Sequence, residues 1–422
     1  MTPRAVPLPM KTTAFLAFHV DTSALDWLMR EFRLLVNESI RTAVTLKLGS
    51  RYRLARASYA DLSRRHSVYK QYIPSAFGVA LRAVKGYRRR LRKGLRASIP
   101  FAHRPMVEAE NQSYRLDRRS GMLRIPIRAG QHVVLSLPVS RWHEKYLTDP
   151  AWSLGALTVV PGRVIIAVRR EAPNRYDPES AIALDMNEES LDGVFSDKNH
   201  AKLIRVPLKD IRTIQERHHR RRRSFSARKS HDHRVLSKLL AKEGVRERNR
   251  VDSRLHFASK RLVEFAAAKR AAIVLEKLTF HGAGGPSHNW KRRFTSWPRG
   301  RLRRLIEYKA NAIGVPIIFI DPHYTSKTCP ACGAQRRGRV GRMFECECGW
   351  RMDRQTNAGL NILKRALASN EALARAVRFQ PDPLRHDVVI SLYDLRVFRE
   401  VARGESSEAD LTKSLTEARQ GN

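Results

Sequence analysis

Acidic side chains are scarce in this 422-residue chain, which has 40 of them against 81 lysines and arginines. The resulting formal net charge of +41 repels itself in a compact fold unless a polyanion neutralises it. Nucleic acid is the polyanion that such an excess most directly indicates. A basic protein bound to a membrane surface is the alternative interpretation.

Long apolar runs are also missing. No stretch reaches the ~18 consecutive apolar residues that a membrane-crossing helix needs. The apolar run near the start, Ala14 to Val20, is short and lacks the cleavage-site context of a signal peptide. We therefore expect a soluble, cytoplasmic protein with no membrane partner. The sequence does not determine an oligomeric state.

Cysteine is rare, and the four that occur form a C-x2-C…C-x-C set. Two close cysteine pairs on facing turns can supply the four soft ligands of a tetrahedral structural zinc site. Two disulfides, or four ordinary buried thiols, are the alternative, and a reducing compartment disfavours disulfides. The second pair has one intervening residue where the commonest ribbon has two, which tightens its turn. The expected zinc ligands are Cys329, Cys332, Cys346 and Cys348.

A strongly basic helical block dominates the N-terminal part of the chain. Residues 12–20 read as a strand, and residues 21–48 as a helix with apolar side chains at helical spacing. The segment 51–104 then holds 15 Lys/Arg and one acid, with five tyrosines interleaved. A solvated face would mix both signs, so this block is better explained as a surface that follows phosphates and offers aromatic stacking. Pro74 is expected to divide it into at least two helices.

Short alternating runs, punctuated by glycine and proline, follow from Met106 and predict a small β-barrel. The strand at 12–20 is expected to join this barrel, which makes the helical block an insertion between barrel strands. Residues 173–178, bounded by prolines, read as the linker to a second domain.

The second domain contains two buried strands that each end in a carboxylate, Ala181–Asp185 and Ala271–Glu276. An arginine run at Arg217–Arg223 and an amphipathic helix lie between them. A third short strand is expected at Val315–Ile320.

Two further segments of the second domain stand out by composition. A glycine-rich loop lies at 282–286, and residues 290–304 carry seven Lys/Arg, no acid and three large aromatic side chains. Beyond about Ala368 the chain becomes slightly acidic, and we assign no role to this tail.

Three acids stand out as candidates for chemistry: Asp185, Glu276 and Asp353. A strand-end carboxylate is often only a turn residue, and Asp353 reads equally well as the N-cap of a helix at 354–368. Converging carboxylates, however, are what a two-metal phosphodiester-cleaving site needs, with two Mg²⁺ about 3.5–4 Å apart. The spacing alone does not establish that the three converge.

Four sequence blocks in this order resemble the RuvC-type nuclease of the TnpB family. That family comprises transposon-encoded RNA-guided DNA nucleases related to the miniature type V CRISPR effectors. The resemblance covers about residues 180–368, and the set is specific although each block alone is weak. The blocks are ALDMNEESL (Ala183–Leu191), IVLEKL (Ile273–Leu278), SKTCPACG (Ser326–Gly333) and CECGWRMDRQTNAGLNI (Cys346–Ile362).

The resemblance implies a multidomain α/β and α+β protein. Its RNase H-like (RuvC) nuclease domain carries an inserted zinc ribbon, which binds target nucleic acid, and follows a wedge-like barrel with a helical basic recognition insertion. The implied boundaries are 1–20 and 105–175 for the barrel, 21–104 for the recognition domain, 178–323 and 351–368 for the nuclease, 324–350 for the ribbon and 369–422 for the tail.

By the same resemblance, Asp185, Glu276 and Asp353 are catalytic and hold two Mg²⁺. The implied partners are a guide RNA and double-stranded target DNA with a short flanking motif. The first motif departs from the usual Asp-Leu-Gly, since it reads Asp185-Met186-Asn187, and Met352 replaces the Arg that often precedes the last Asp. A transposon and a CRISPR context both stay open.

The basic segments supply the predicted contacts with nucleic acid. The N-terminal block would bind the backbone of RNA or of the heteroduplex. The arginine run would bridge the two lobes of the protein by binding phosphates between them. Residues 290–304 would guide a single strand towards the site by stacking and charge. The residues singled out are Arg88, Arg89, Arg90, Arg220, Arg221, Arg222, Arg223, Trp290, Arg292 and Arg293.

Two other functions compete with a guided nuclease. A non-catalytic zinc-ribbon regulator would use the same charge and zinc but would not need all three acids. An unguided RNase H-like nuclease or transposase would need the acids but would cut without RNA.

Overall fold

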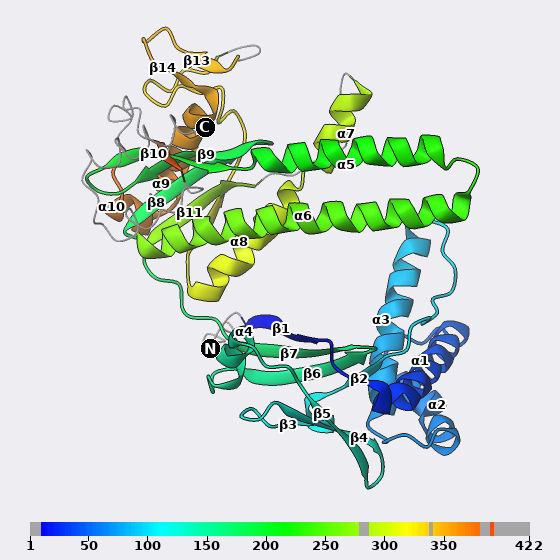
Figure 1. The fold of residues 1–422 in the computed structure, drawn as a ribbon. Coiled ribbons are helices and arrows are strands. Elements are labelled where there is room, and N and C mark those ends of the chain that lie inside the picture. The colour runs from blue at the N-terminus through cyan, green and yellow to red at the C-terminus, as the bar shows by residue number, and fades with distance from the viewer. Residues whose placement is uncertain (1–9, 278–286, 337–340, 380–388, 392–422) are drawn as a thin grey trace. The chain divides into compact units, whose positions relative to one another are not determined.

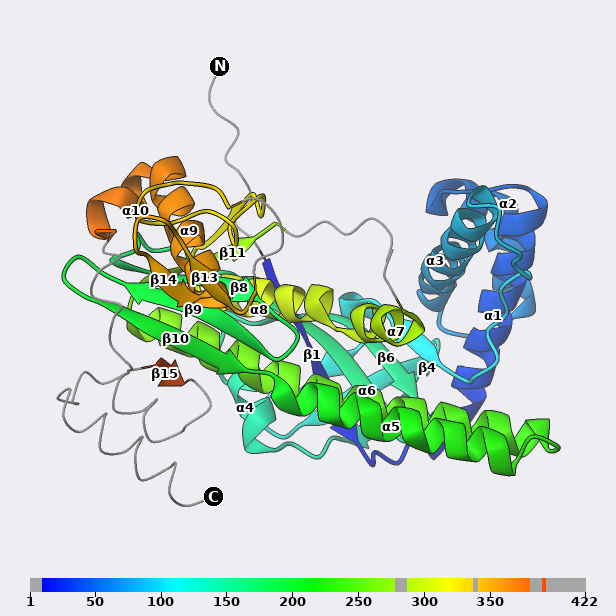
Figure 2. The same ribbon diagram turned by 90° about the horizontal axis from the view of Figure 1, so that it is seen from above.

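The computed structural model describes residues 10–277, 287–336, 341–379 and 389–391. The chain divides into two compact units, Met1–Glu171 and Ala172–Asn422, which are described separately. The boundary lies directly before the predicted linker at 173–178. The glycine-rich loop at 282–286 and most of the C-terminal tail lie outside the described residues. Figures 1 and 2 show the elements of each unit from two directions.

Two sheets form the β part of the first unit, where the sequence predicted one small barrel. One sheet has four strands and the other three, and the described strands do not close into a ring. Residue alternation predicts which side chains are buried, but it does not predict which strand edges pair. In spatial order, the first sheet is β1 (Met10–Phe18), β7 (Arg163–Glu171), β6 (Ser153–Val160) and β2 (Val107–Ala109), and the second is β3 (Arg115–Leu116), β4 (Met122–Arg128) and β5 (Gln131–Ser136).

Strand β1 pairs antiparallel with β7 along its whole length, from Met10 opposite Glu171 to Phe18 opposite Arg163. The strand before the helical block therefore lies beside strands that come after it. Side chains from both sheets and from the helices share one apolar core. Whether these segments act as separate functional domains stays a prediction.

Three helices form the basic block of the first unit. Ser50 caps the second of them, since its side chain accepts a hydrogen bond from the Arg53 N–H at 3.2 Å. Pro74 does not break a helix. It lies in the first turn of α3, where its missing N–H costs no intrahelical bond, and the break falls upstream. The helical elements of the unit are η1 (Ser23–Leu25), α1 (Asp26–Thr45), α2 (Arg51–Arg65), α3 (Tyr72–Arg92), η2 (Asn111–Ser113) and α4 (Arg141–Leu147).

A six-stranded mixed sheet organises the second unit. Strand β8, one of its two central strands, is antiparallel to β9 on one side and parallel to β11 on the other. In spatial order the strands are β12 (Ile317–Ile320), β11 (Ala271–Glu276), β8 (Ser180–Met186), β9 (Ser190–Ser196), β10 (Ala201–Pro207) and β15 (Val389–Ser391). The last of these comes from the tail and pairs parallel with β10, a role that the sequence analysis did not assign.

Helices cover both faces of this sheet, and alternation along β8 and β11 decides which side chain meets which helix. Ile182 and Leu184 pack in the core with α6 and α8, whereas Ala183 packs with α9. The same parity puts Asp185 and Glu276 on the α9 face. The helices of this unit are α5 (Lys209–Arg228), α6 (His233–Ala268), α7 (His288–Ser296), α8 (Arg299–Ile313), α9 (Arg354–Ser369) and α10 (Glu371–Ala376).

Helices α5 and α6 form a long antiparallel hairpin (Figure 1). A fully buried polar pair joins them, since His218 Nδ1 lies 2.7 Å from Glu243 Oε1. No helix in the described part of the chain is long and apolar enough to cross a membrane.

Candidate metal centres and nucleic-acid interface

Asp185 and Glu276 lie side by side at one edge of the sheet. The parallel register pairs Leu184 with Leu275, so the two acids follow at the next position of neighbouring strands. Adjacent strands are about 4.8 Å apart. Both side chains also point to the α9 face, and the Asp185 charge acts on the Glu276 carboxylate. The sequence named both acids at strand ends and left their convergence open, and the structure places these two on neighbouring strands.

Burial makes the ionised form of both acids costly. It raises the pKa of Asp185 to about 6, although its side chain keeps some surface open to solvent. It also raises the pKa of Glu276 to about 7, and the Asp185 charge adds to that increase. Two adjacent carboxylates that resist ionisation form a place where a divalent cation would be stabilised. The donor set therefore fits Mg²⁺, which prefers carboxylate oxygens.

Polar residues that the sequence analysis missed surround Asp185. Asn187 Nδ2 donates to Asp185 Oδ2 at 3.1 Å, so the residue that replaces the usual glycine holds the carboxylate. Asp192 lies directly opposite on β9, is buried, and accepts hydrogen bonds from Ser190 and Arg205. In the sequence, Asp192 could have been recognised as the one charged residue of the segment Ser190–Ser196.

Asp353 is the N-cap of α9, as the simpler interpretation predicted. Its Oδ1 accepts from the Gln355 N–H at 2.9 Å, and its Oδ2 lies 3.5 Å from Arg342 Nε. The neighbouring Arg354 lowers the pKa of Asp185, which counteracts part of the increase due to burial. The start of α9 is thus close to the strand-end acids.

Two glycines let α9 approach the sheet closely. A Cβ on Gly359 would lie 2.5 Å from the Cα of Gly193, and one on Gly193 would lie 1.9 Å from the Ala183 carbonyl oxygen. Only hydrogen fits at either position. This contact determines how near the start of α9, with Asp353, lies to β8.

A groove of about 810 Å³ connects Asp353 with the Asn187 loop. Its lining includes four arginines, Arg205, Arg293, Arg342 and Arg354, and three acids, Glu188, Glu189 and Asp353. Three of the arginines form ion pairs, Arg205 with Asp192, Arg293 with Glu188 and Arg342 with Asp353. The lining therefore keeps only a small excess of positive charge. Within the described residues, the three predicted acids do not form a cluster with ligand oxygens all within 4.8 Å, so their convergence stays a prediction.

The four cysteines do form such a cluster. The four Sγ atoms all lie within 4.8 Å of one another. The Sγ atoms of Cys329 and Cys348 are 3.6 Å apart, and so are those of Cys332 and Cys346. A disulfide would require about 2 Å. A tetrahedron with Zn–S distances of about 2.3 Å has edges of about 3.8 Å. The thiols are therefore unbridged and suit a structural zinc ion.

The shortened cysteine pair is accommodated within its turn. In the first turn the Gly333 N–H donates to the Cys329 carbonyl, and in the second the Gly349 N–H donates to the Cys346 carbonyl. Both glycines adopt the left-handed conformation, with φ of 79° and 85°. The second turn closes one residue earlier, and the sulfurs still converge. A hairpin of β13 (Met343–Glu345) and β14 (Arg351–Asp353) joins this ribbon to α9.

The predicted arginines of α5 differ in their environments. Arg221 lies 3.5 Å from Glu243, and Arg222 forms an ion pair with Glu247. Both acids are on α6, so these two arginines help to join the hairpin. Arg220 and Arg223 are exposed.

Helix α7 is attached to the edge of the groove. Arg293 binds Glu188 with two hydrogen bonds, of 3.2 Å and 2.5 Å. Trp290 is 37% exposed and stacks on Phe294, with ring centroids 4.8 Å apart. The buried Nε of Arg292 has no hydrogen-bond partner within the described residues. Trp290 thus presents an aromatic surface beside basic side chains.

Arg88, Arg89 and Arg90 also divide into two kinds. Arg88 donates to the carbonyls of Ala43 and Leu48, at 2.9 Å and 3.1 Å, so it caps the end of α1. Arg89 and Arg90 are exposed.

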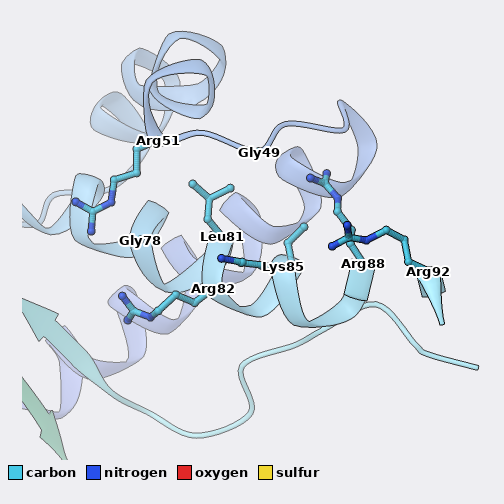
Figure 3. Close-up of a pocket in the computed structure, with 9 residues that line it drawn as sticks. Gly49, Arg51, Gly78, Leu81, Arg82, Lys85, Arg88 and Arg92 are labelled. Atoms are coloured by element: carbon cyan, nitrogen blue, oxygen red, sulfur yellow. The ribbon is translucent and has the colours of Figure 1, made fainter. Parts of the chain in front are cut away.

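A basic pocket of about 420 Å³ lies between the start of α2 and one face of α3 (Figure 3). Arg51 and Arg82 at this pocket form ion pairs with Glu110 and Glu108. Lys85 and Arg92 line it too, and neither has an ion pair within the described residues. The pocket therefore keeps excess positive charge; its lining cations are Arg51, Arg82, Lys85, Arg88 and Arg92.

Comparison with known proteins gives relatives for most of the chain. Residues 300–362 match the family described as Cas12f1-like, TNB domain. The chain is 27% identical over 242 residues to the TnpB-like protein MJ0751 of Methanocaldococcus jannaschii, which covers 56% of this chain and 87% of that protein. It is 29% identical over 166 residues to the CRISPR-associated endodeoxyribonuclease Cas12f2 of a Micrarchaeota archaeon, over 33% of this chain and 30% of that one.

Two solved structures share the fold at low sequence identity. A Cas12f1–sgRNA–target DNA complex matches with a TM-score of 0.56 and 14% identity, over 80% of this chain and 82% of that chain. CasPhi-2 (Cas12j), bound to crRNA and phosphorothioate-DNA, matches with a TM-score of 0.50 and 12% identity, over 86% and 91%.

Fold and cysteine cluster together define a mixed α/β protein of the kind seen in Cas12f and Cas12j structures. The chain is similar to TnpB-like proteins and to Cas12f endodeoxyribonucleases, and its residues 300–362 match the Cas12f1-like TNB domain.

Proposed function

We propose that this protein is an RNA-guided DNA endonuclease that cuts next to a short flanking motif. The observation that carries the proposal is the pair of carboxylates, Asp185 and Glu276, on one face of neighbouring parallel strands. Similarity supports the class, since the Cas12f2 relative is named an endodeoxyribonuclease. The strand order supports the RNase H-like (RuvC) domain that the sequence resemblance implies.

The chain's own groups would divide the work as follows. Asp185 and Glu276 supply oxygens from the sheet, and Asp353 supplies one from the start of α9. Asn187 holds one oxygen of Asp185, which orients the other. Bound Mg²⁺ supplies Lewis-acid activation of a water and of the leaving oxygen of the phosphodiester. The small positive excess of the groove lining would attract the DNA backbone towards these carboxylates.

RNA and DNA would bind the basic surfaces of both units. In the first unit, the pocket beside Lys85 and Arg92 suits backbone phosphates. In the second unit, Arg220 and Arg223 offer exposed charge, and Trp290 offers a stacking surface. A guide RNA would supply sequence specificity by base pairing, while the protein reads a short duplex motif.

The test begins with RNA that co-purifies with the full chain, which is sequenced to identify the guide. A repeat-spacer transcript indicates a CRISPR context, and a transposon-end transcript indicates a TnpB context. Plasmids with and without the guide-matched target are then incubated with the complex and Mg²⁺, across candidate flanking motifs. We expect cutting of the matched plasmid alone, and none with Asp185→Asn.

One observation favours a second candidate, the non-catalytic zinc-ribbon binder. Asp353 already caps α9 and lies near Arg342, so its position has a structural explanation without metal. Guide-dependent binding of the matched plasmid without cutting would support this candidate. Equal cutting of matched and unmatched plasmids would instead support an unguided nuclease.

A further inference from the structure

A buried hydrogen bond joins the candidate cation ligand Glu276 to the segment that leads into the zinc ribbon. Thr325 Oγ1 donates to Glu276 Oε1 at 2.6 Å, and the two residues are only 4% and 5% exposed. Because Oε1 accepts this bond, Oε2 is the oxygen that keeps both of its lone pairs for a cation. The Thr325 hydroxyl therefore sets which way the carboxylate faces.

The Thr325 hydroxyl has a second acceptor within reach. It lies 3.2 Å from the Pro322 carbonyl oxygen, and a hydroxyl has one hydrogen to donate. A small displacement of the Thr325 backbone would change the balance between Glu276 and Pro322. The position of that backbone is consequently important for the orientation of Glu276.

Two buried asparagines of α9 hold that backbone. Asn361 Nδ2 lies 2.8 Å from the Thr325 carbonyl and 2.7 Å from the Thr328 carbonyl. Asn357 Nδ2 donates to the Thr328 carbonyl at 2.9 Å. Thr328 directly precedes the first zinc cysteine, so these bonds also anchor the first cysteine pair.

The second cysteine pair is connected to the same asparagines. Trp350 Nε1 donates to Asn357 Oδ1 at 3.1 Å, and Trp350 comes two residues after Cys348. Both cysteine pairs and Glu276 are thus linked through one hydrogen-bond network. A change in the ribbon would be transmitted to Glu276 through Asn357, Asn361 and Thr325.

We propose that Thr325 is a positioning residue for Glu276, and that the zinc ribbon determines where its hydroxyl lies. This inference rests on the proposed function, because it takes Glu276 as a cation ligand. It assigns the ribbon a second task in addition to binding nucleic acid, namely to orient a carboxylate of the nuclease centre.

The experiment measures the affinity of the zinc-loaded, full-length protein for Mn²⁺ by electron paramagnetic resonance. Thr325→Val removes the hydroxyl and keeps the shape, and we expect it to weaken Mn²⁺ binding by about 10-fold or more. Thr325→Ser keeps the hydroxyl and should restore binding. Thr328→Val is the matched control, because its hydroxyl donates to Tyr324 and not to a carboxylate. Zinc content and melting temperature are measured for each variant.

Trp350→Phe tests whether the ribbon positions the Thr325 hydroxyl. It removes the indole N–H without touching a cysteine, and should weaken Mn²⁺ binding in the same direction at unchanged zinc content. Unchanged Mn²⁺ affinity in Thr325→Val overturns the proposal, as does a Thr325→Ser variant that binds as poorly as the valine. If Thr325→Val does not fold, unchanged affinity in Trp350→Phe overturns it.

Failure of this inference differs from failure of the proposed function. Asp185→Asn and Glu276→Gln should both lose Mn²⁺ if the nuclease centre is correctly assigned. If neither does, the proposed function is wrong. If both lose Mn²⁺ while Thr325→Val binds normally, only the role of Thr325 is wrong.

Discussion

Asp185 is partly buried and Glu276 is buried, and the raised pKa values of these two acids have a consequence for stability. A folded-state pKa of about 6 or 7, above the ordinary 3.8 or 4.5, means that the native state favours the protonated carboxyl. The stability that the protonated carboxyls contribute is fully present below about pH 4 and is lost as the pH rises through 6 to 7. Above that range, each ionised carboxylate lowers the free energy of unfolding by on the order of 3 kcal/mol, although the two groups are coupled and their effects are not additive.

We therefore predict that Asp185→Asn stabilises the Mg²⁺-free, zinc-loaded protein at about pH 8 and has little effect at about pH 5. The amide cannot ionise, so the cost that appears at high pH disappears. Denaturant unfolding of both proteins at the two pH values measures this difference. An equal effect at both values would contradict the assignment of burial as the cause.

Asp353 has a structural and a proposed chemical role that substitutions can separate. Asn caps a helix about as well as Asp, so Asp353→Asn should keep the stability and lose cleavage. Asp353→Ala should lose cleavage and about 1 kcal/mol of stability as well. Asn370→Ala removes the cap of α10 and serves as the control, with cleavage retained. A cleaving Asp353→Asn protein would leave this residue as a cap alone.

At the scale of elements, the contact between α9 and β9 controls the geometry of the site. An alanine normally stabilises a helix by up to about 1 kcal/mol relative to glycine. At Gly359, however, the new Cβ would meet the Gly193 backbone at 2.5 Å, so α9 must move away from the sheet. We predict that Gly359→Ala lowers both stability and cleavage.

Gly86→Ala is the matched control for this helix–sheet contact. Gly86 lies inside α3 with open space around its Cβ position, so the substitution should be neutral or stabilising. Thermal unfolding and plasmid cleavage compare the two variants. A stabilised, active Gly359→Ala protein would show that the close approach is not needed.

The ribbon is the second element whose integrity can be tested. Its small core consists of Cys329 and Phe344 with Trp350 beside them, which is too little apolar surface to fold without a metal. We predict about one zinc per chain by elemental analysis, and its loss in Cys329→Ser. A folded, full-length protein without zinc would contradict this expectation.

For the whole molecule, a net charge of +41 predicts binding to nucleic acid that weakens steeply with salt, because bound phosphates release counterions. Lys85→Ala and Arg92→Ala should each reduce the slope of log affinity against log salt by about 1. Arg375→Ala removes the same charge from an i,i+4 pair within α10 and should leave the slope unchanged. Filter binding across a salt series measures the slopes.

Arg88→Ala should behave differently from these pocket substitutions. Its guanidinium holds the Ala43 carbonyl in the last turn of α1 and the Leu48 carbonyl just beyond it, so its loss should lower the melting temperature of the first unit. Unchanged slopes in the Lys85 and Arg92 variants would exclude the pocket as a phosphate site.

Local sequence signals were sufficient for several features of this protein. The apolar strands that end in Asp185 and Glu276, the helix after Asp353 and the four-cysteine set could all be predicted, because each depends on residue type and short-range periodicity. Net charge alone indicated a polyanionic partner. The boundary after Glu171 lies just before the proline-bounded linker at 173–178, and the predicted domain bounds stay a prediction.

Features that depend on pairing between residues distant in the sequence were decided only by the tertiary structure. Strand parity and the parallel register brought Asp185 and Glu276 together, and the Gly193–Gly359 contact brought α9 against them. The two sheets of the first unit and the tail strand beside β10 depend on which edges pair, which alternation along a strand does not specify. Thr325 acquires its proposed role only through a residue 49 positions away. Such contacts are properties of the folded chain, because burial and distance, which raise a pKa or orient a carboxylate, do not exist in the sequence.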